Sequence, residues 1–450
     1  MQLFRALLLL PLALPGSGAV PAQTQAGPLT LGQAFAIADS QAYANRLAGA
    51  ALELRTTERD QTFKGLLPSL RVEGGWTRTT DPLNAFGFAL RQRSVTEESF
   101  DPARLNFPEA ISNIGAGLVA EVPLINPDVW LGRRAAALAV DAADAMTRWQ
   151  RASARLEVVR AYFGGVLARE QVEAHEAGWT AAQSHVRLAR SLLTQGLVTR
   201  SDVLRAEVKA GEIEATLIKA RGQAGLAGRQ LALALGLPDS IAVLLPDTLP
   251  DLAGLSRLDS APEPALRADV AAAHAGAEAA KRDVDRATSL LFPRINSFGR
   301  VDWNQPDRIG GHPAWTVGVM ASWSFFGGGS ELIARRAAQA RAVAAATEAE
   351  VTQARAALEL ASRRNDLTVA RATAEIAARA VGQAIEAHRI VTRQYEGGLA
   401  TVTELLESAA VETRTRVERA AAVYQVIVAA AAWRVAAGGD GSDLTVLDQR

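Results

Sequence analysis

The chain contains no cysteine among its 450 residues, and only 5% of its residues are aromatic. The lack of cysteine excludes disulfide bonds, thiol nucleophiles, iron–sulfur clusters and a lipid attached to an N-terminal cysteine. The formal net charge is +0, which gives no indication of a nucleic-acid-binding surface. Thiol chemistry and nucleic-acid binding are therefore removed from the functions to be considered.

Patterns for metal binding and catalysis are also scarce. The five histidines form no ligand cluster along the sequence, and three methionines are too few for a relay of soft-metal ligands. The three glycines at 327–329 are not followed by Lys-Ser or Lys-Thr, so they are no phosphate-binding loop, and a GxSxG nucleophile elbow is missing. We therefore expect no enzyme, no cofactor and no metal site.

The N-terminal segment has the features of a secretory signal. Arg5 precedes an apolar run, small residues follow, and Ala22 offers a cleavage point, which predicts a signal peptide over residues 1–22. Pro11 and Pro15 interrupt the run well short of the roughly 20 apolar residues that a membrane-spanning helix needs. We expect an exported protein.

The rest of the chain is an internal duplication. GLVTRSDVL at 196–204 matches GLATVTELL at 398–406, and GLVAEVPLINPDVWLGRRAA at 117–136 aligns with GVMASWSFFGGGSELIARRA at 318–337. Because the same elements recur in the same order, we divide the chain into repeats at 23–235 and 265–450. A proline-rich connector, 236–264, joins them, and we expect it to wrap the middle of the molecule.

Long proline-free stretches predict helices over 128–195, 201–235, 329–396 and 401–437, in addition to a helix near the start of each repeat. In the first stretch, apolar residues recur every seven positions from Leu131 to Val166, which is typical of a coiled coil. Glycines at 196 and 397–398 suit helix C-termini, and the threonines that follow suit N-caps. Each repeat therefore contains a long helical hairpin with a tight turn at its tip.

Four shorter segments alternate between apolar and polar residues, at about 66–80, 112–125, 291–304 and 313–326. Period-two patterning over about ten residues with aromatics near the ends is typical of strands in a membrane barrel, the alternative being an ordinary sheet with one wet face. An open four-stranded sheet leaves unpaired edges, which lipid does not tolerate. Three chains with twelve strands are the simplest closed arrangement.

An insertion at 78–111 is found only in the first repeat. It joins the first two strands, so we expect an external, partly ordered surface loop. A lid or a ligand contact is the alternative interpretation.

The order of these motifs resembles the outer membrane efflux protein family, the TolC-like channel-tunnels. The resemblance rests on LTLGQAFAIA (29–38), LPSL (67–70), EVPLIN (121–126), SWSFFGGG (322–329) and the two tip turns. It implies an α+β membrane protein that forms a homotrimer, with a twelve-stranded β-barrel in outer membrane lipid and an α-helical barrel extending into the periplasm. It also implies a passive exit duct that works with a periplasmic adaptor (membrane fusion) protein and an inner-membrane transporter.

Two questions stay open at this point. The exported cargo is either small molecules or polypeptides in type I secretion. A different class of function, a periplasmic coiled-coil adaptor or scaffold, would instead have one hairpin flanked by lipoyl-like β segments.

The resemblance assigns roles to the tip turns. It implies that the turns dock the adaptor, through Gly196, Leu197, Val198, Thr199, Gly398, Leu399, Ala400 and Thr401. It further implies that Asp202, Glu404 and Glu407 ring the pore entrance, where like charges repel one another and attract cations. The alternative is helix capping, since carboxylates in a first turn favour the helix dipole, and the two roles are compatible.

Arg200 is a candidate for holding the entrance closed. Some members of the family carry an arginine shortly before the acids of the second turn, where this chain has Ala400. We hypothesise that Arg200 of the first turn replaces it by pairing with Glu404 or Asp202. The alternative is a solvated surface arginine.

Overall fold

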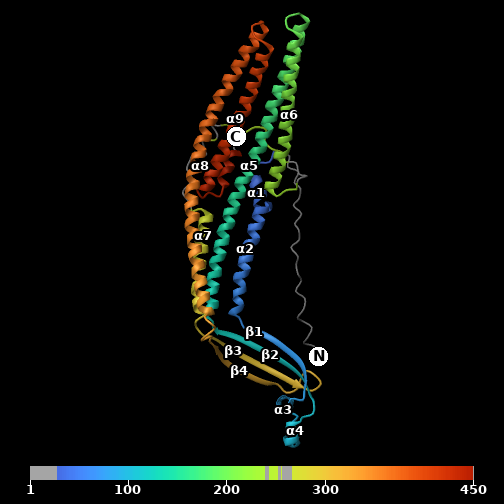
Figure 1. The fold of residues 1–450 in the computed structure, drawn as a ribbon, viewed down its shortest axis with the longest axis vertical. Coiled ribbons are helices and arrows are strands. Elements are labelled where there is room, and N and C mark those ends of the chain that lie inside the picture. The colour runs from blue at the N-terminus through green and yellow to red at the C-terminus, as the bar shows by residue number, and fades with distance from the viewer. Residues whose placement is uncertain (1–27, 239–242, 252–254, 256–265, 449–450) are drawn as a thin grey trace.

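The computed structural model describes residues 28–238, 243–251, 255 and 266–448. The protein is long and narrow, with a helical region at one end and a sheet at the other (Figure 1). The expected signal peptide, 1–22, and much of the connector lie outside the described residues.

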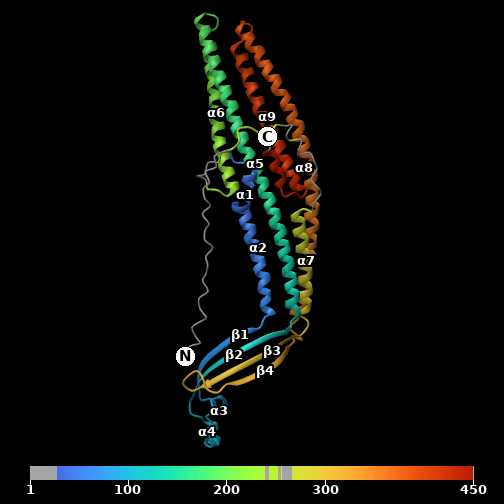
Figure 2. The ribbon, with the colours of Figure 1, turned by 180° about the vertical axis from the view of Figure 1, so that it is seen from behind.

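Two long helical hairpins run side by side for the upper part of the molecule (Figures 1 and 2). One consists of α5 (Pro127–Thr194) and α6 (Arg200–Leu235), and the other of α8 (Ser330–Glu396) and α9 (Val402–Ala436). Nearer the sheet, α2 (Tyr43–Gln61) packs along α5, and α7 (Ala268–Ser289) packs along both α5 and α8. A shorter helix, α1 (Leu31–Gln41), precedes α2. Among the described residues, no helix is long and apolar enough to cross a bilayer.

The length of α5 follows from its sequence. It has 68 residues, with proline only at its first position, where no intrahelical N–H is needed. At 1.5 Å per residue such a helix is about 100 Å long. The opening helix of the first repeat, in contrast, is divided in two at Ala42, whose backbone leaves the helical region with φ −55° and ψ 131°.

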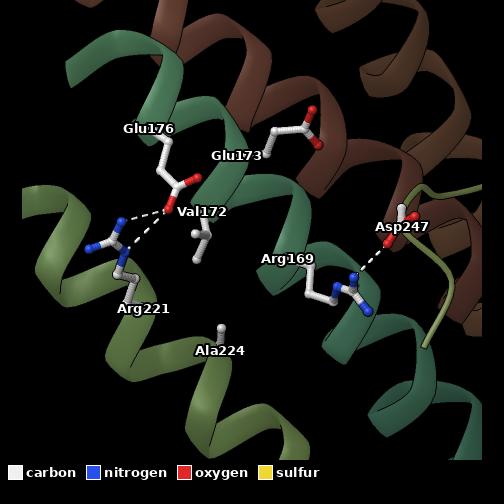
Figure 3. Close-up of a pocket in the computed structure, with 7 residues that line it drawn as sticks. All are labelled: Arg169, Val172, Glu173, Glu176, Arg221, Ala224 and Asp247. Carbon is white, nitrogen blue, oxygen red and sulfur yellow. Dashed lines mark hydrogen bonds and ion pairs between the residues drawn. The ribbon is translucent and has the colours of Figure 1, made fainter. Parts of the chain in front are cut away.

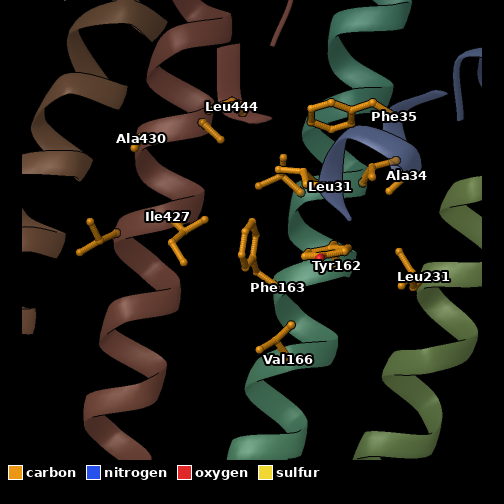
Figure 4. Close-up of a cluster of buried hydrophobic side chains, with 14 of the residues drawn as sticks. Leu31, Ala34, Phe35, Tyr162, Phe163, Val166, Leu231, Ile427, Ala430 and Leu444 are labelled. Atoms are coloured by element: carbon orange, nitrogen blue, oxygen red, sulfur yellow. The ribbon is translucent and has the colours of Figure 1, made fainter. Parts of the chain in front are cut away.

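The main core lies at mid-length, where α1, α5, α6 and α9 meet (Figure 4). Phe163 and Ile427 face each other across α5 and α9, while Leu31 and Leu231 close the cluster from α1 and α6. The Tyr162 hydroxyl donates a 2.7 Å hydrogen bond to the carbonyl oxygen of Leu29. The apolar ring of Tyr162 can therefore be buried, because this hydrogen bond satisfies its hydroxyl group within the core.

Two arginines tie distant segments to this helical scaffold. Arg155 of α5 contacts Asp39 of α1 at 2.6 Å and Asp440, just before the C-terminal 3-10 helix Ser442–Asp448, at 3.0 Å. Arg267, whose side chain is 8% exposed, contacts Asp269 at 2.7 Å and Glu359 of α8 at 2.9 Å. Removing one partner of such a pair would leave a charge without compensation, so these contacts fix how the helices meet.

The four strands form one antiparallel sheet in the order β1-β2-β3-β4, with β1 (Ser69–Thr79), β2 (Ile111–Ile125), β3 (Arg294–Gln305) and β4 (Ala314–Ser322). One face is apolar and open, with Val72 79% exposed on β1 and Trp315 73% exposed on β4. The opposite face is polar: Arg300 contacts Glu73 at 3.3 Å and Asp302 at 2.7 Å. The expected four strands and their two-faced character are confirmed.

Two details of the sequence analysis are wrong. The fourth strand ends at Ser322 rather than near 326, because Trp323 turns back to donate a 3.0 Å hydrogen bond from Nε1 to the carbonyl oxygen of Leu291. The insertion is not a plain loop: it holds α3 (Pro82–Arg91), a 3-10 helix (Glu97–Phe100) and α4 (Pro102–Asn106). The side chains of Asp81 and Asp101 cap α3 and α4, each followed by proline at the first helical position.

Candidate functional site

The tips of the two hairpins, at the end farthest from the sheet, have the same backbone geometry. In the first, Gly196 has φ 75°. The N–H of Leu197 donates to the carbonyl oxygen of Leu192 at 3.0 Å, and the N–H of Gly196 donates to that of Leu193 at 3.0 Å. This pair of bonds is a Schellman motif, which satisfies carbonyl groups left over at a helix C-terminus.

The second tip repeats this arrangement. Gly398 has φ 73°, the N–H of Leu399 donates to the carbonyl oxygen of Gln394 at 2.7 Å, and the N–H of Gly398 donates to that of Tyr395 at 3.1 Å. A residue with a Cβ is costly in this left-handed conformation, so glycine at both positions follows from the turn itself.

Each turn is followed by a reciprocal capping box. In the first, Asp202 Oδ2 accepts hydrogen bonds from the Thr199 N–H at 3.0 Å and hydroxyl at 2.8 Å, while Thr199 Oγ1 accepts from the Asp202 N–H at 3.3 Å. In the second, Glu404 Oε2 accepts from the Thr401 N–H at 2.6 Å and hydroxyl at 3.0 Å, while Thr401 Oγ1 accepts from the Glu404 N–H at 3.2 Å. Both carboxylates are therefore held directly beside the turns.

The capping boxes keep these carboxylates ionised. The backbone N–H of Thr199, followed by its hydroxyl, lowers the pKa of Asp202, and the charge of Arg205 acts in the same direction. The backbone N–H and hydroxyl of Thr401 lower the pKa of Glu404 in the same way. Hydrogen bonds to the charged form stabilise it, so both turns carry a negative charge over a wider pH range than free carboxyl groups.

A small second core lies under the turns and joins the two hairpins. It contains buried residues from α5, α6, α8 and α9, namely Val186, Ala189, Val203, Ala206, Tyr395, Val402, Leu405 and Leu406. Tyr395 of α8 is buried in this core, where burial, and then the charge of Asp202, raise the pKa of its hydroxyl. The two tips are therefore one packed unit, although 202 positions separate Thr199 from Thr401 along the chain.

Apolar groups are nevertheless left open at the very ends. Leu197 is 67% exposed and Leu399 is 84% exposed, each at the corresponding place in its turn. Between α6 and α9, a groove of about 410 Å³ opens beside the turns, lined by Ser201, Leu204, Arg205, Val208, Lys209, Glu212, Thr403, Leu406 and Glu407. The tips thus offer apolar anchors next to charged side chains of both signs.

Comparison with known proteins identifies this architecture. A model of the outer membrane efflux protein family matches residues 41–237 and 264–439, which together span both repeats. The chain belongs to the outer membrane efflux protein family. It is accordingly an outer membrane efflux channel that extends into the periplasm, and it is a transport protein rather than an enzyme. A search of curated proteins gave no match.

Solved structures have the same fold. The outer-membrane channel OprN is 21% identical, with a TM-score of 0.73, and the match covers 92% of this chain and 90% of that one. CmeC of Campylobacter jejuni is 16% identical with a TM-score of 0.75, over 91% of this chain and 86% of that one. VceC of Vibrio cholerae is 22% identical with a TM-score of 0.72, over 91% of this chain and 96% of that one.

Family membership also bears on the open alternatives. Channels of this family act as trimers with periplasmic adaptors and inner-membrane transporters. Neither the fold nor any comparison favours the adaptor or scaffold alternative, and the strands lie at the end opposite the hairpin tips (Figure 1).

The structure separates the roles of the predicted entrance residues. Glu404 forms the capping box of the second turn, whereas Glu407, one turn later, lines the groove between α6 and α9. Arg200, the first residue of α6, is exposed and makes no ion pair within the described residues of the chain, and the electrostatic partner of Asp202 on α6 is Arg205 instead. Among the described residues of one chain, the hypothesised pairing of Arg200 with Glu404 or Asp202 is not formed.

Sequence reasoning missed Tyr395, which lies two residues before the glycine pair of the second turn. An aromatic residue just before a Gly-Gly helix end is a usable signal, but the core that buries it includes residues of the other repeat. Two histidines that sequence reasoning kept apart also meet: the rings of His185 and His388 lie 5.8 Å apart between α5 and α8. No group of three or more metal-ligating side chains occurs among the described residues.

A second hollow, at mid-length between α5 and α6, is lined by structural ion pairs (Figure 3). Glu176 of α5 contacts Arg221 of α6 at 2.7 Å, and Arg169 of α5 contacts Asp247 of the connector at 2.5 Å. The Leu249 N–H donates to Glu170 Oε1 at 3.2 Å. These contacts hold α6 and the described part of the connector against α5.

Proposed function

We propose that three copies of this chain form the passive exit duct of a tripartite efflux system. Their sheets close a twelve-stranded barrel in outer membrane lipid, and their helices form a tunnel whose entrance lies at the hairpin tips. The tip turns dock a periplasmic adaptor, which links the duct to an inner-membrane transporter. The observation that carries the proposal is the duplicated turn, with an exposed leucine and an ionised carboxylate at each tip.

The state of the sheet supports trimeric closure. Each of the inner strands β2 and β3 is paired on both sides, whereas β1 and β4 are each paired on one side only. Unpaired backbone groups are very costly in lipid, and the apolar face of the sheet, including Leu70 and Val317, is open. Pairing of β4 with β1 of the next copy satisfies both edges and presents a continuous apolar face to lipid.

The tips have the properties of a docking surface for helices. Leu197 and Leu399 project beyond the packed core, and the neighbouring groove exposes the apolar residues Leu204 and Val208 beside Lys209 and other charged groups. An amphipathic helical hairpin from an adaptor fits such a surface through apolar anchors, with its polar face against the charged rim. Val198, Thr199, Ala400 and Thr401 shape the turns that present the leucines.

The carboxylates support a charged entrance. Three copies bring together three sets of Asp202, Glu404 and Glu407, and the lowered pKa values of the first two keep them charged at neutral pH. A ring of carboxylates favours cations in a pore. We assign Arg200 to pairing with Asp202 or Glu404 of a neighbouring copy, because Arg200 is exposed and forms no ion pair among the described residues of its own chain.

The docking role is tested in cells that depend on the channel for export of a toxic substrate. Replacing both tip leucines, Leu197→Ser with Leu399→Ser, removes the apolar anchors without touching the capping boxes. We expect export to be lost while the trimer still assembles and still conducts ions in a planar bilayer. Leu266→Ser, which removes a leucine that is 68% exposed away from the tips, serves as the matched control and should export normally.

Normal export by the double tip variant would contradict the docking role. Failure of the wild-type protein itself to form conducting trimers in the bilayer would contradict the duct.

A further inference from the structure

The insertion of the first repeat forms a small helical cap at the outer end of the sheet. The cap is residues 80–110, which leave β1 after Thr79 and enter β2 at Ile111, two residues that are paired in the sheet. Figure 1 shows α3 and α4 beyond the ends of the strands, at the opposite end of the molecule from the hairpin tips. The second repeat has no counterpart, so one cap is present per chain.

The cap is anchored on the polar face of the sheet. Gln92 Nε2, at the end of α3, donates to the Ser112 carbonyl oxygen at 2.8 Å and to Asn113 Oδ1 at 2.9 Å. Asn113 Nδ2 in turn donates to Asn304 Oδ1 at 2.9 Å. These two asparagines are only 5% and 8% exposed, because the cap and the neighbouring strand shield them.

The strand register shows which face of the sheet carries Asn113. Asn113 pairs with Thr77, and four positions further along each strand Glu73 pairs with Gly117. Because side chains alternate between faces, Asn113 shares a face with Glu73 and its contact Arg300. That polar face lines the interior when the apolar face meets lipid. The cap therefore lies over the barrel interior, a step that rests on the proposed trimeric closure.

Helix α3 is apolar on both sides. Ala85, only 4% exposed, faces the rest of the chain, and the rings of Phe86 and Phe100 meet edge to face at 5.8 Å inside the cap. On the other side, Leu83 is 82% exposed and Leu90 is 52% exposed, two helical turns apart on one face. Among the described residues of the chain, nothing covers this second face.

The dimensions of the barrel and of a helix indicate what can cover the exposed face of α3. Twelve strands about 4.8 Å apart and tilted by about 40° enclose a backbone circle of about 24 Å in diameter. Three helices of about 10 Å diameter packed around one axis occupy a circle of about 22 Å. The caps also continue directly from β1, the edge strand at which neighbouring copies meet.

We propose that the three caps of the trimer pack against one another on the threefold axis, through Leu83 and Leu90, and close the outer mouth of the channel. The occupant of the exposed face of α3 is thus the same helix of the other two copies. Gln92 and Asn113 act as the anchor that keeps each cap over the interior.

Labelling from outside the cell tests this closure, and the cysteine-free chain makes single reporters simple to introduce. Arg71→Cys places a thiol on the interior face below the cap, since Arg71 contacts Glu73 at 3.5 Å. Arg308→Cys places one in the exposed β3–β4 connection outside it. Intact cells are treated with a linear polyethylene-glycol maleimide that is too large for the general porins.

The decisive comparison removes the cap. Residues 80–110 are replaced by Asn-Gly, which closes a two-residue hairpin between the paired residues Thr79 and Ile111. We expect Arg308→Cys to react with or without the cap, and Arg71→Cys to react several-fold faster once the cap is gone. Equal reaction of Arg71→Cys in both backgrounds would overturn the proposal. Unreactive Arg308→Cys would overturn it together with the outer-membrane orientation on which it rests.

A second measurement tests contact between the caps of neighbouring copies while the cap is kept in place. Leu83→Cys in isolated outer membranes is treated with a short bismaleimide. Covalent links between copies are expected for Leu83→Cys and not for Arg308→Cys. If Leu83→Cys reacts only singly while Arg71→Cys remains shielded, the exposed face of α3 meets lipid or another molecule, and contact between the caps is refuted.

Discussion

The two tip turns have the same backbone but different surroundings. Both end a helix with a left-handed glycine, and both begin the next helix with a capping box. Under the second turn, however, Val402, Leu405 and Leu406 are all buried, whereas in the first Val203 is buried and Leu204 is 52% exposed. The difference arises because α9 packs against α5, α8 and α6, while α6 packs chiefly against α5. The two repeats therefore share the turn and the capping box, but α9 is more deeply packed between neighbouring helices than α6.

The largest expected difference between the turns concerns their buried side chains. Leu405→Ala, at a fully buried position, should lower the free energy of local opening of the tip by about 2–5 kcal/mol. Val203→Ala, the corresponding change in the first turn, should cost about two thirds as much, since two side-chain carbons are lost instead of three. Native-state hydrogen exchange of the tip amides measures both.

The exposed Leu204→Ala is the control, with an expected change within about 0.5 kcal/mol. A larger loss from Val203→Ala than from Leu405→Ala would refute the deeper packing of α9.

The glycines should respond equally, in contrast to the buried side chains. Gly196→Ala and Gly398→Ala should each cost about 1–2 kcal/mol, because an added Cβ meets no atom within 4 Å at either site and only the left-handed backbone is strained. Hydrogen exchange of the amides after each turn reports the loss. Gly397→Ala, where φ is −85°, is the matched control and should change little. A clear inequality between the two turns would show that one backbone is supported by contacts that the other lacks.

The capping threonines should have smaller and similar effects. Thr199→Ala and Thr401→Ala each remove a side-chain acceptor at an N-cap, with an expected cost of about 1 kcal/mol. Limited proteolysis at the tips should become faster in both, and Thr→Ser at the same positions should restore protection. An effect in one turn only would mean that the other capping box does not form in the assembled channel.

Lowering the pH should reduce the stability of both turns, by less than any of the substitutions above. The pKa values of Asp202 and Glu404 are lowered in the folded state, so their contribution is present above the pKa of the unfolded chain and is lost as pH falls through the folded value. The expected window lies below about pH 4. Asp202→Asn and Glu404→Gln should remove the pH dependence of tip exchange, each in its own turn. Persistence of the dependence in the double variant would assign it to other groups.

The sequence predicts the tips well because their structure is local. Glycine, threonine and a carboxylate within nine residues specify the helix end, the turn and the next helix start, and their repetition in both halves strengthens the prediction. Alternation in β1 and β4 likewise indicates the four-stranded sheet, since one face stays apolar throughout.

What the sequence does not predict depends on contacts between distant segments. The packing of Tyr395 in a core shared with α5 and α6 joins the two repeats, and the anchoring of Gln92 on Asn113 depends on how the cap folds back over the sheet. The cap helices themselves had a local signal, Asp-Pro at 81–82 and 101–102, which the polar composition of the insertion obscured.

The most direct test of the charged entrance is the reversal potential of single channels in a planar bilayer under a salt gradient. Asp202→Asn is compared with the double variant Glu404→Gln and Glu407→Gln, and Glu278→Gln on α7 is the control away from the tips. If the duplicated turns form the entrance, the wild type is cation-selective, and both tip variants shift the reversal potential toward zero while Glu278→Gln does not. A reversal potential that stays the same in both tip variants would contradict the account.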